Sequence, residues 1–195
     1  LTTAIEQGQI HITRQEADMT KLHTDTPLAE AIFELFDEFA TLTTEKFGEL
    51  PDGTIKAYIF GGCAVHLHTN ARGSDDLDTE LTAAGKLDVK SVTLELDSVY
   101  FNDPERGESI LDWDANFNTG IQSLAPDYKE RAIRLKFDSS PLHIYLVSAA
   151  DVAVSKLGRA AEDDIKDMKT LFLAGCFTLD EFKSLANEAL EYEVC

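Results

Sequence analysis

The sequence predicts an α+β fold, in which a mixed β-sheet core with flanking helices is followed by a C-terminal helical segment. An amphipathic helix pattern stands early in the chain, short runs rich in β-branched and aromatic residues fill the middle, and helical periodicity returns from about residue 148. No internal repeat or low-complexity linker divides the 195 residues. We therefore expect a single domain over residues 1–195, with a core at about 26–147 and the helical segment at about 148–195.

The first helix is predicted from its two ends and its apolar spacing. Thr26 is a typical N-cap residue and Pro27 suits the first helical position, whereas Gly48 and the Pro-Asp-Gly turn at 51–53 end the pattern. Apolar residues recur between these ends at steps of three and four: Leu28, Ala31, Ile32, Leu35, Phe36, Phe39 and Leu42. Residues 1–24 are polar and weakly periodic, and we interpret them as an arm with one short helix.

The middle of the chain predicts short strands separated by glycine-rich and polar breaks. Residues 55–60 form the first strand, Gly61 and Gly62 end it, and residues 63–68 are expected to form a short helix. Further strands are expected at four places: 76–81, 92–101, 131–137 and 142–147. Residues 102–128 are rich in Asn, Asp, Gly and Pro, and we expect them to be mostly loop.

Three helices are expected in the C-terminal segment. Ser148 with Asp151 has the spacing of a capping box, as has Thr178 with Glu181, and these pairs begin the first and the last helix. The first is expected to run to about Arg159. Apolar residues at helical spacing mark the second helix and the buried face of the last: Ile165, Met168, Leu171 and Phe172, then Phe182, Leu185, Ala189 and Leu190.

Composition narrows the class of protein. The 36 acidic and 17 basic residues give a net charge of −19, which argues against broad nucleic-acid binding but does not exclude a small nucleotide held by a metal ion. Hydrophobic residues at 44% and charged residues at 27% are ordinary for a globular protein. No apolar run is long enough for a transmembrane helix, so we expect no membrane partner. Three sparse cysteines without zinc-site spacing predict a reduced, cytoplasmic protein.

One segment carries the residues that indicate chemistry. A strand ends in Gly61 and Gly62 and a helix follows, so the backbone can approach a phosphate closely and the helix N-terminus offers free N–H groups. Asp76 and Asp78 stand two residues apart and would face the same side of a strand. Paired carboxylates suit Mg²⁺ or Mn²⁺, and Mg²⁺ typically binds substrate phosphates as well.

Each half of this pattern has an ordinary structural explanation. Two adjacent glycines usually form a turn, and an isolated pair of acids two residues apart usually lies on a solvated strand edge. The order and close spacing of the two halves, with Arg72 and Ser74 in the connection, favour instead a site for a metal-bound nucleoside triphosphate (NTP).

The same residues resemble the signature of the nucleotidyltransferase superfamily with the polymerase-β-like fold. That signature is an apolar residue before Gly-Gly or Gly-Ser, a gap, and then acid–apolar–acid–apolar. This chain has FGG at 60–62, thirteen further residues, and DLDT at 76–79, where Thr79 departs from the apolar last position.

A second stretch, Ser148 to Phe172, resembles the C-terminal signature of AbiEii-type toxin nucleotidyltransferases and their uncharacterised bacterial relatives. The matching positions are Asp151, Lys156, Arg159, Asp164 and Asp167. Residues 114–118, Tyr128 and the Arg131-Ala132 pair resemble the middle of those relatives. The resemblance therefore spans about residues 55–175.

The resemblance implies transfer of a nucleotidyl group from an NTP with loss of pyrophosphate. Asp76 and Asp78 would be catalytic and would hold one or two Mg²⁺ or Mn²⁺ ions. The nucleotide would be bound by five residues: Gly61, Gly62, Arg72, Ser74 and Lys156. Lys156 would also be catalytic because it balances phosphate charge, although a helix lysine often only lays its stem along apolar surface. Arg72 alternatively pairs with nearby acids.

The supporting acids and the third metal ligand leave alternatives open. Asp164 and Asp167 share one helix face, where they would orient Lys156 or Arg159 or form a solvated surface. Many members of the superfamily supply a third carboxylate from a neighbouring strand, as metal ligand or base. We prefer Glu95, which stands between two leucines of an expected strand, over four other acids: Asp97, Asp112, Asp114 and Asp138.

Four further residues have mainly structural interpretations. His66 and His68 are two apart on a helix, so we expect one to be packed and one to lie at the surface. Trp113 is expected to pack against the core rather than against a base. Cys63 lies near a helix N-terminus that would lower its thiol pKa, but burial as a small apolar residue is the favoured interpretation.

Three functions follow from these patterns. The main hypothesis is an NTP-dependent nucleotidyltransferase, for which the AbiEii-type resemblance implies a toxin role and a cognate antitoxin as partner. The second hypothesis is an enzyme that modifies a cationic small molecule such as an aminoglycoside, an acceptor that the acidity of the chain favours. Basic clusters at 129–136 and 156–169 favour tRNA as the acceptor instead. The third hypothesis is a non-catalytic binding module on the same fold. The intact acid pair counts against it, and the unassigned third acid counts for it.

Overall fold

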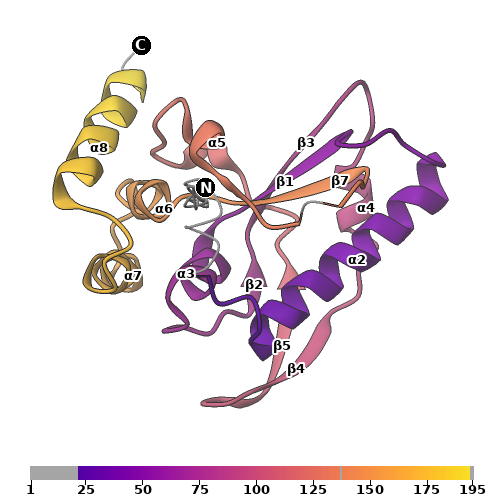
Figure 1. The fold of residues 1–195 in the computed structure, drawn as a ribbon, viewed down its shortest axis with the longest axis horizontal. Helices are drawn as coiled ribbons and strands as arrows, with labels where there is room; N and C mark the ends of the chain where they lie inside the picture. The colour runs from indigo at the N-terminus through magenta and orange to yellow at the C-terminus, as the bar shows by residue number, and fades with distance from the viewer. Residues whose placement is uncertain (1–21, 137, 194–195) are drawn as a thin grey trace, which may run out of the picture.

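Two small β-sheets form the centre of the computed structural model, which describes residues 22–136 and 138–193 (Figure 1). The four-stranded sheet has the order β3-β1-β7-β6, and the three-stranded sheet has the order β2-β5-β4. The strands are β1 Ile55–Ile59, β2 Asp76–Leu77, β3 Thr79–Ala83, β4 Val99–Asp103, β5 Gly107–Trp113, β6 Ile133–Arg134 and β7 Leu142–Leu146. Because β1 is antiparallel to β3 but parallel to β7, the sheet is mixed and the predicted α+β class is confirmed.

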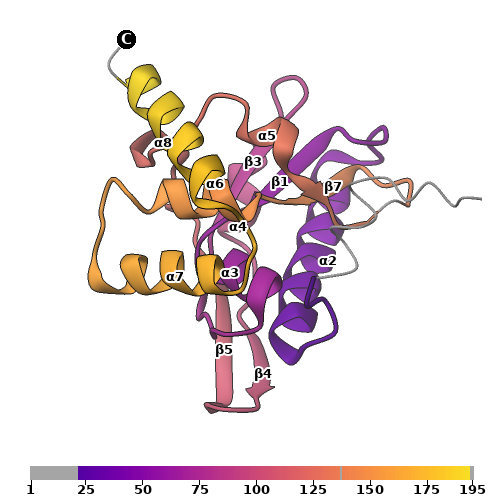
Figure 2. The same ribbon diagram turned by 60° about the vertical axis from the view of Figure 1, so that its left-hand side comes forward.

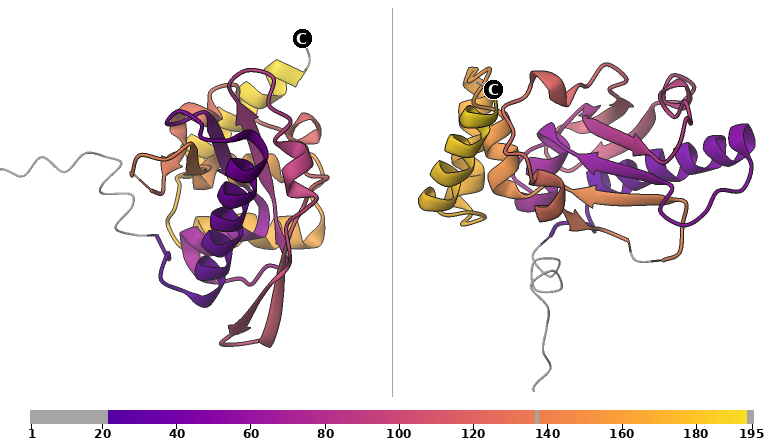
Figure 3. Two further views of the ribbon diagram at one scale, coloured as in Figure 1. Left: turned by 90° about the vertical axis from the view of Figure 1, so that its right-hand side faces the viewer. Right: turned by 90° about the horizontal axis from the view of Figure 1, so that it is seen from above.

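Helix α2 (Pro27–Phe47) is the element that the sequence predicted most completely. Thr26 caps it by accepting a hydrogen bond from the Ala29 N–H at 3.2 Å, and it ends at Gly48, whose φ is +75°. The helix lies across one side of both sheets (Figures 1 and 3), and its apolar stripe is buried against them. That stripe includes Ile32, Leu35, Phe36 and Phe39, none of which is exposed.

The chain crosses from one sheet to the other at Asp78. Asp76 pairs with Asp112 of β5, whereas Thr79 pairs with Ile59 of β1. At the crossing, the Phe60 N–H donates to the Asp78 carbonyl at 2.9 Å. The prediction of one continuous strand over 76–81 is therefore wrong, since two strands in two sheets meet at this residue.

Three predictions for the chain after β3 are also wrong, wholly or in part. Residues 90–93 form a short helix, α4 (Lys90–Thr93), which Asp88 begins by accepting from the Ser91 N–H, and β4 starts only at Val99. The expected loop 102–128 contains the whole of β5, the 3₁₀ helix Thr119–Ile121 and the start of α5 (Tyr128–Arg131). Strand β5 exists because it pairs with β4 in a hairpin, a partnership that its own mixed composition does not predict. Within the described residues 131–136, the expected strand is reduced to the two residues of β6.

The C-terminal segment contains α6 (Ala149–Ser155), α7 (Glu162–Leu173) and α8 (Leu179–Glu193). Both predicted N-caps are present: Ser148 accepts from the Asp151 N–H and Thr178 from the Glu181 N–H, each at 3.2 Å. Helix α6 is shorter than expected, so Lys156 caps its end and Arg159 lies beyond it. The three helices pack together at one side of the sheets, with α6 and α7 against α3 (Gly61–Thr69), as Figure 2 shows.

The last helix buries Leu185 and Ala189 as expected, but Leu190 is 59% exposed, so that part of the prediction is wrong. The short helix expected within residues 1–24 lies almost entirely outside the described residues, and the single-domain boundary stays a prediction. Among the described residues, none of the helices is both long enough and apolar enough to cross a membrane.

Candidate functional site

The turn from β1 into α3 brings a carboxylate against a glycine backbone. Gly61 has φ +60°, and a Cβ atom there would lie 1.8 Å from Oδ2 of Asp78. A Cβ on Gly62 would lie 2.6 Å from Oγ of Ser74. The two glycines are thus required because the loop that carries Ser74 and Asp78 passes directly over the first turn of α3.

Gly61→Ala should therefore disturb both the backbone and the site. An L-residue at positive φ costs about 1–2 kcal/mol, and the new methyl group must also displace the Asp78 carboxylate. We expect a lower melting temperature and at least tenfold weaker NTP binding. Gly85→Ala is the matched control, because Gly85 has φ +81° with nothing within 4 Å of the added Cβ. Equal losses of nucleotide binding in the two variants would contradict a special role for Gly61.

Three carboxylates converge beside this turn, from Asp76, Asp78 and Asp114. Burial raises the pKa of Asp78 to about 6, with the negative charges of Asp114 and then Asp76 adding to the shift. Burial also raises the pKa of Asp76, and Asp114 is again the strongest of the neighbouring charges. Strand β5 places Asp114 here: it runs parallel to β2, and the Asp114 N–H donates to the Leu77 carbonyl at 3.2 Å.

Glu95, the preferred third acid, lies elsewhere. The strand expected around it is absent, and its carboxylate pairs with Nζ of Lys46 at 2.6 Å, near the C-terminal end of α2. It contributes to the pKa of neither Asp76 nor Asp78. Of the alternatives, Asp112 is paired with Asp76 and raises the pKa of that one acid, whereas Asp114 raises the pKa of both Asp76 and Asp78. Its signal in the sequence was its position shortly after β5, which was not recognised as a strand.

The acids suit a hard cation that phosphate oxygens help to bind. Among the described residues, no group of three or more His, Cys, Asp or Glu side chains is arranged to hold a metal ion by itself. The negative charges of Asp76 and Asp78 nevertheless repel each other, and this repulsion disfavours ionisation of both carboxyl groups. A divalent ion between them would relieve the repulsion. One or two carboxylates completed by substrate phosphates is a usual environment for Mg²⁺. The donor set therefore fits Mg²⁺ or Mn²⁺ delivered with an NTP.

Metal binding at this site should depend on pH. Because the Asp78 pKa is raised to about 6, a divalent ion must displace a proton below that pH. We expect Mn²⁺ affinity to fall about tenfold between pH 7 and pH 5, with protons released on binding at the lower pH. Calorimetry in two buffers of different ionisation enthalpy would measure both. In Asp78→Asn the binding should be weak and nearly independent of pH; a wild-type affinity that is flat over this range would contradict the account.

Lys156 lies in a buried network of charges between α6 and α7. It is 8% exposed, and its Nζ lies 2.8 Å from Oδ2 of Asp167 and 3.5 Å from Oδ1 of Asp164. Arg159 binds Asp164 through Nε and Nη2 at 2.6 and 2.7 Å, which lowers the pKa of that carboxyl to about 2. Arg72 pairs with Asp167. Since both acids are at most 2% exposed, the solvated-face alternative is wrong.

Two cations of this network also act on Asp78. The positive charges of Lys156 and Arg159 both oppose the upward shift of the Asp78 pKa, so they lie within electrostatic reach of that side chain. The candidate site thus has acids suited to a metal ion and cations suited to phosphate within electrostatic reach of one another. The pairing alternative for Arg72 is confirmed, since its guanidinium contacts Asp167.

The remaining candidates have structural roles in the ligand-free protein. Ser74 Oγ donates to the Asp76 carbonyl at 3.0 Å, so its contact with a phosphate stays a prediction. Cys63 is buried and burial raises its thiol pKa, which confirms the structural interpretation. Trp113 stacks on Phe39 with ring centroids 5.4 Å apart. His66 is packed as expected, but His68 is half-buried with a bond to the backbone, so the surface position expected for one of them is wrong.

Comparison with known proteins identifies a family. Residues 30–194 match the model of a family described as nucleotidyltransferases of unknown function (DUF6036). No curated protein and no solved structure matches the chain. The match extends from α2 to the end of α8 and so includes the glycine turn, the three carboxylates and the Lys156 network. The chain therefore belongs to this family of nucleotidyltransferases of unknown function.

Proposed function

We propose that the protein is a Mg²⁺- or Mn²⁺-dependent enzyme that moves a nucleoside monophosphate from an NTP to a hydroxyl group of an acceptor. The acceptor oxygen forms a bond to the α-phosphorus, the bond from that phosphorus to the β-phosphate bridging oxygen breaks, and pyrophosphate leaves. The observation that carries the proposal is the proximity of Asp76, Asp78 and Asp114 beside the Gly61 turn, with Lys156 and Arg159 within electrostatic reach of Asp78.

Each part of the site has a role in this reaction. The backbone of Gly61 and Gly62 and the hydroxyl of Ser74 bind the triphosphate, helped by the N-terminus of α3. Lys156 neutralises phosphate charge and is itself held by Asp164 and Asp167. A divalent ion held by Asp76 and Asp78 would supply charge stabilisation at the attacking and leaving oxygens.

Asp114 is the proposed acceptor of the hydroxyl proton. Its Oδ1 accepts a hydrogen bond from the Asn116 N–H at 2.8 Å, which fixes the carboxylate at the end of β5. Asp114→Asn should reduce transfer by about 10²–10⁴-fold, the usual contribution of a general base, while NTP binding changes little. Single-turnover transfer and NTP titration would separate the two effects. A variant that loses NTP binding and transfer together would make Asp114 a binding residue instead.

The direct experiment uses NTPs labelled at either end. With α-labelled NTP, Mg²⁺ and candidate acceptors (tRNA, protein and aminoglycosides), the label should move to the acceptor; with γ-labelled NTP it should appear only in pyrophosphate. Transfer of the γ-label would make the protein a phosphotransferase. Failure of all four NTPs to bind would favour the non-catalytic module.

A narrower role rests on the resemblance of Ser148 to Phe172 to AbiEii-type toxins. It supports a toxin of a toxin–antitoxin or defence system, with a cognate antitoxin as protein partner. Cytoplasmic location is proposed on the sparse cysteines without zinc-site spacing, of which Cys63 is a buried thiol.

A further inference from the structure

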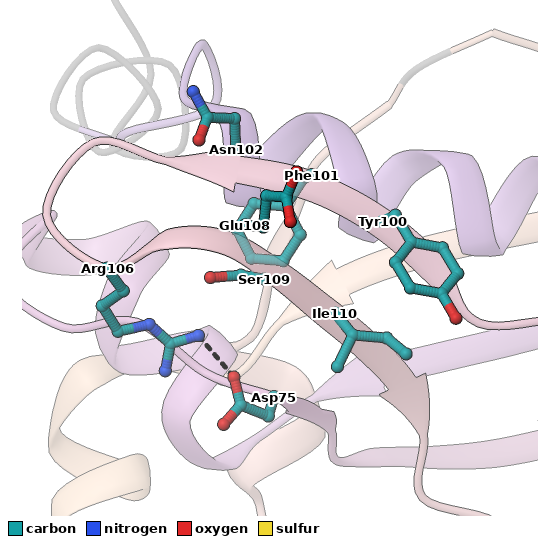
Figure 4. A pocket seen from close by; sticks show the side chains of 8 residues that line it. All are labelled: Asp75, Tyr100, Phe101, Asn102, Arg106, Glu108, Ser109 and Ile110. Carbon is teal, nitrogen blue, oxygen red and sulfur yellow. Dashed lines mark hydrogen bonds and ion pairs between the residues drawn. The ribbon is translucent and has the colours of Figure 1, made fainter.

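The β4–β5 hairpin carries an open cleft of about 800 Å³ that the reaction above does not use (Figure 4). The residues that matter for its chemistry are Asp75, Tyr100, Asn102, Arg106, Glu108 and Ile110. The hairpin projects beyond the rest of the molecule, as Figures 1 and 2 show. Its far face is covered: Leu111 is fully buried, and Trp113 packs on Phe36 and Phe39 of α2.

The strand register joins this cleft to the candidate active site. Tyr100 is opposite Ile110 and Asn102 is opposite Glu108, so these four side chains share one face of the hairpin. Along β5 the same face continues from Glu108 and Ile110 to Asp112, which is paired with Asp76. Ile110 therefore lies about 7 Å along β5 from Asp112, the residue that is paired with Asp76 of the acid site. A molecule of one or two rings in the cleft would reach the site carboxylates.

The lining of the cleft selects a kind of molecule. Tyr100 is 80% exposed and Ile110 lies beside it, so an apolar ring face can stack there. Glu108 is exposed on the same face of the hairpin as Tyr100. Arg106 forms ion pairs with Asp75 and Asp103, which offset its positive charge. Phosphates of a nucleic acid would meet this negative charge, whereas a cation is attracted both by the carboxylates and by the aromatic face.

We propose that the β4–β5 face is the acceptor subsite, and that the acceptor is a small hydroxyl-bearing organic cation with a ring, of the amino-sugar class. Its ring stacks on Tyr100, an ammonium group pairs with Glu108, and one hydroxyl reaches the acids from the hairpin side while the triphosphate lies at the glycine turn. This inference rests on the proposed function: the hydroxyl oxygen bonds to the α-phosphorus, pyrophosphate leaves, and the hydroxyl proton passes to Asp114.

The test measures binding of neomycin, a polycationic amino sugar, by calorimetry to the wild-type chain and to Tyr100→Ala and Glu108→Gln. Tyr192→Ala and Glu191→Gln are matched controls, because these residues are exposed on α8. We expect neomycin to bind about tenfold more weakly to Tyr100→Ala and several-fold more weakly to Glu108→Gln, with less than twofold change in the two controls. N-acetylated neomycin, which lacks the ammonium charges, should bind at least tenfold more weakly to the wild type than neomycin does. Equal neomycin binding by Tyr100→Ala and Tyr192→Ala would overturn the subsite. A single-stranded oligoribonucleotide that binds this face more tightly than neomycin, and is weakened by Tyr100→Ala, would overturn the acceptor class.

Nucleotide binding in the same proteins separates this inference from the proposed function. Tyr100→Ala should bind Mg²⁺ and NTP as the wild type does, and wild-type transfer of an α-label to neomycin should fall at least tenfold in this variant at low neomycin concentration. If the wild type binds no NTP, the proposed function fails. If NTP binding and neomycin binding are both intact but insensitive to Tyr100, only the acceptor subsite fails.

Discussion

Asp78→Asn is expected to abolish metal-dependent nucleotidyl transfer and, at the same time, to stabilise the ligand-free protein. The pKa of Asp78 is raised to about 6 because the carboxylate is partly buried and close to the negative charges of Asp114 and Asp76. In the unfolded chain the same group ionises near pH 4. The folded state therefore binds the proton more tightly, and the cost of the ionised carboxylate is fully present above pH 6 and disappears as the pH falls towards 4. Asparagine removes this cost, which we expect to be roughly 1–3 kcal/mol at pH 7.5.

Measurements of stability and of transfer activity on Asp78→Asn distinguish a carboxylate kept for function from one that stabilises the fold. Thermal melts at pH 7.5 should show a higher melting temperature for Asp78→Asn than for the wild type, and the difference should vanish near pH 4. Transfer should be lost because an amide is a poor ligand for a hard cation. Asp97→Asn is the control, since Asp97 is exposed on the loop before β4 and should change neither property. An unfolded Asp78→Asn protein would mean that the carboxylate holds the fold together.

Lys156→Met should have the largest effect on stability of the substitutions considered. Its Nζ lies between Asp164 and Asp167, which are 1% and 2% exposed, so its removal leaves buried negative charge with fewer partners. Breaking a buried pair in this way typically costs about 3–5 kcal/mol, although Arg159 and Arg72 remain to offset part of it. We also expect loss of NTP binding, because the same ammonium group is proposed to neutralise phosphate charge.

A matched pair of variants tests this second expectation. Arg159 has a side chain that is 75% exposed, whereas that of Lys156 is 9% exposed, so Arg159→Gln should destabilise the protein less than Lys156→Met even though it also removes a partner of the buried Asp164. Chemical denaturation at pH 7 would compare the free energies of unfolding of Lys156→Met and Arg159→Gln.

The stability of this network should also depend on pH. The folded pKa of Asp164 is about 2, below its unfolded value, so the stability that its ion pairs give is present above pH 4 and is lost as the pH falls towards 2. Equal stability of Lys156→Met and wild type would show that the network is not a stabilising one.

Elements with local signals were predictable from the sequence. Helix α2 has a cap, a proline and a glycine at its ends and an unbroken apolar stripe between them, and each signal acts within a few residues. The turn at Gly61 was predictable because only glycine tolerates both positive φ and the close approach of Asp78. The caps at Ser148 and Thr178 are equally local.

Features that depend on distant partners were not predictable in the same way. The break at Asp78 arises because Asp76 pairs with β5 and Thr79 with β1, and no local pattern states which strand a residue will join. The choice of Glu95 over Asp114 failed for this reason: alternation around Glu95 indicated a strand, while the hairpin that places Asp114 is held by register with β4. The sequence placed Asp164 and Asp167 on one face, but their burial against Lys156 required the packing of α6 on α7.

The central claim is that the glycine turn and the converging acids form a site for a metal-bound NTP. The most direct measurement is calorimetric titration of each NTP into the wild type and into Asp78→Asn, with and without Mg²⁺. We predict heat of binding for at least one NTP in the wild type, much stronger with Mg²⁺ than without it, and loss of that enhancement in Asp78→Asn. Absence of binding for all four NTPs in both conditions, or binding that is the same with and without Mg²⁺ and in both proteins, would contradict the claim.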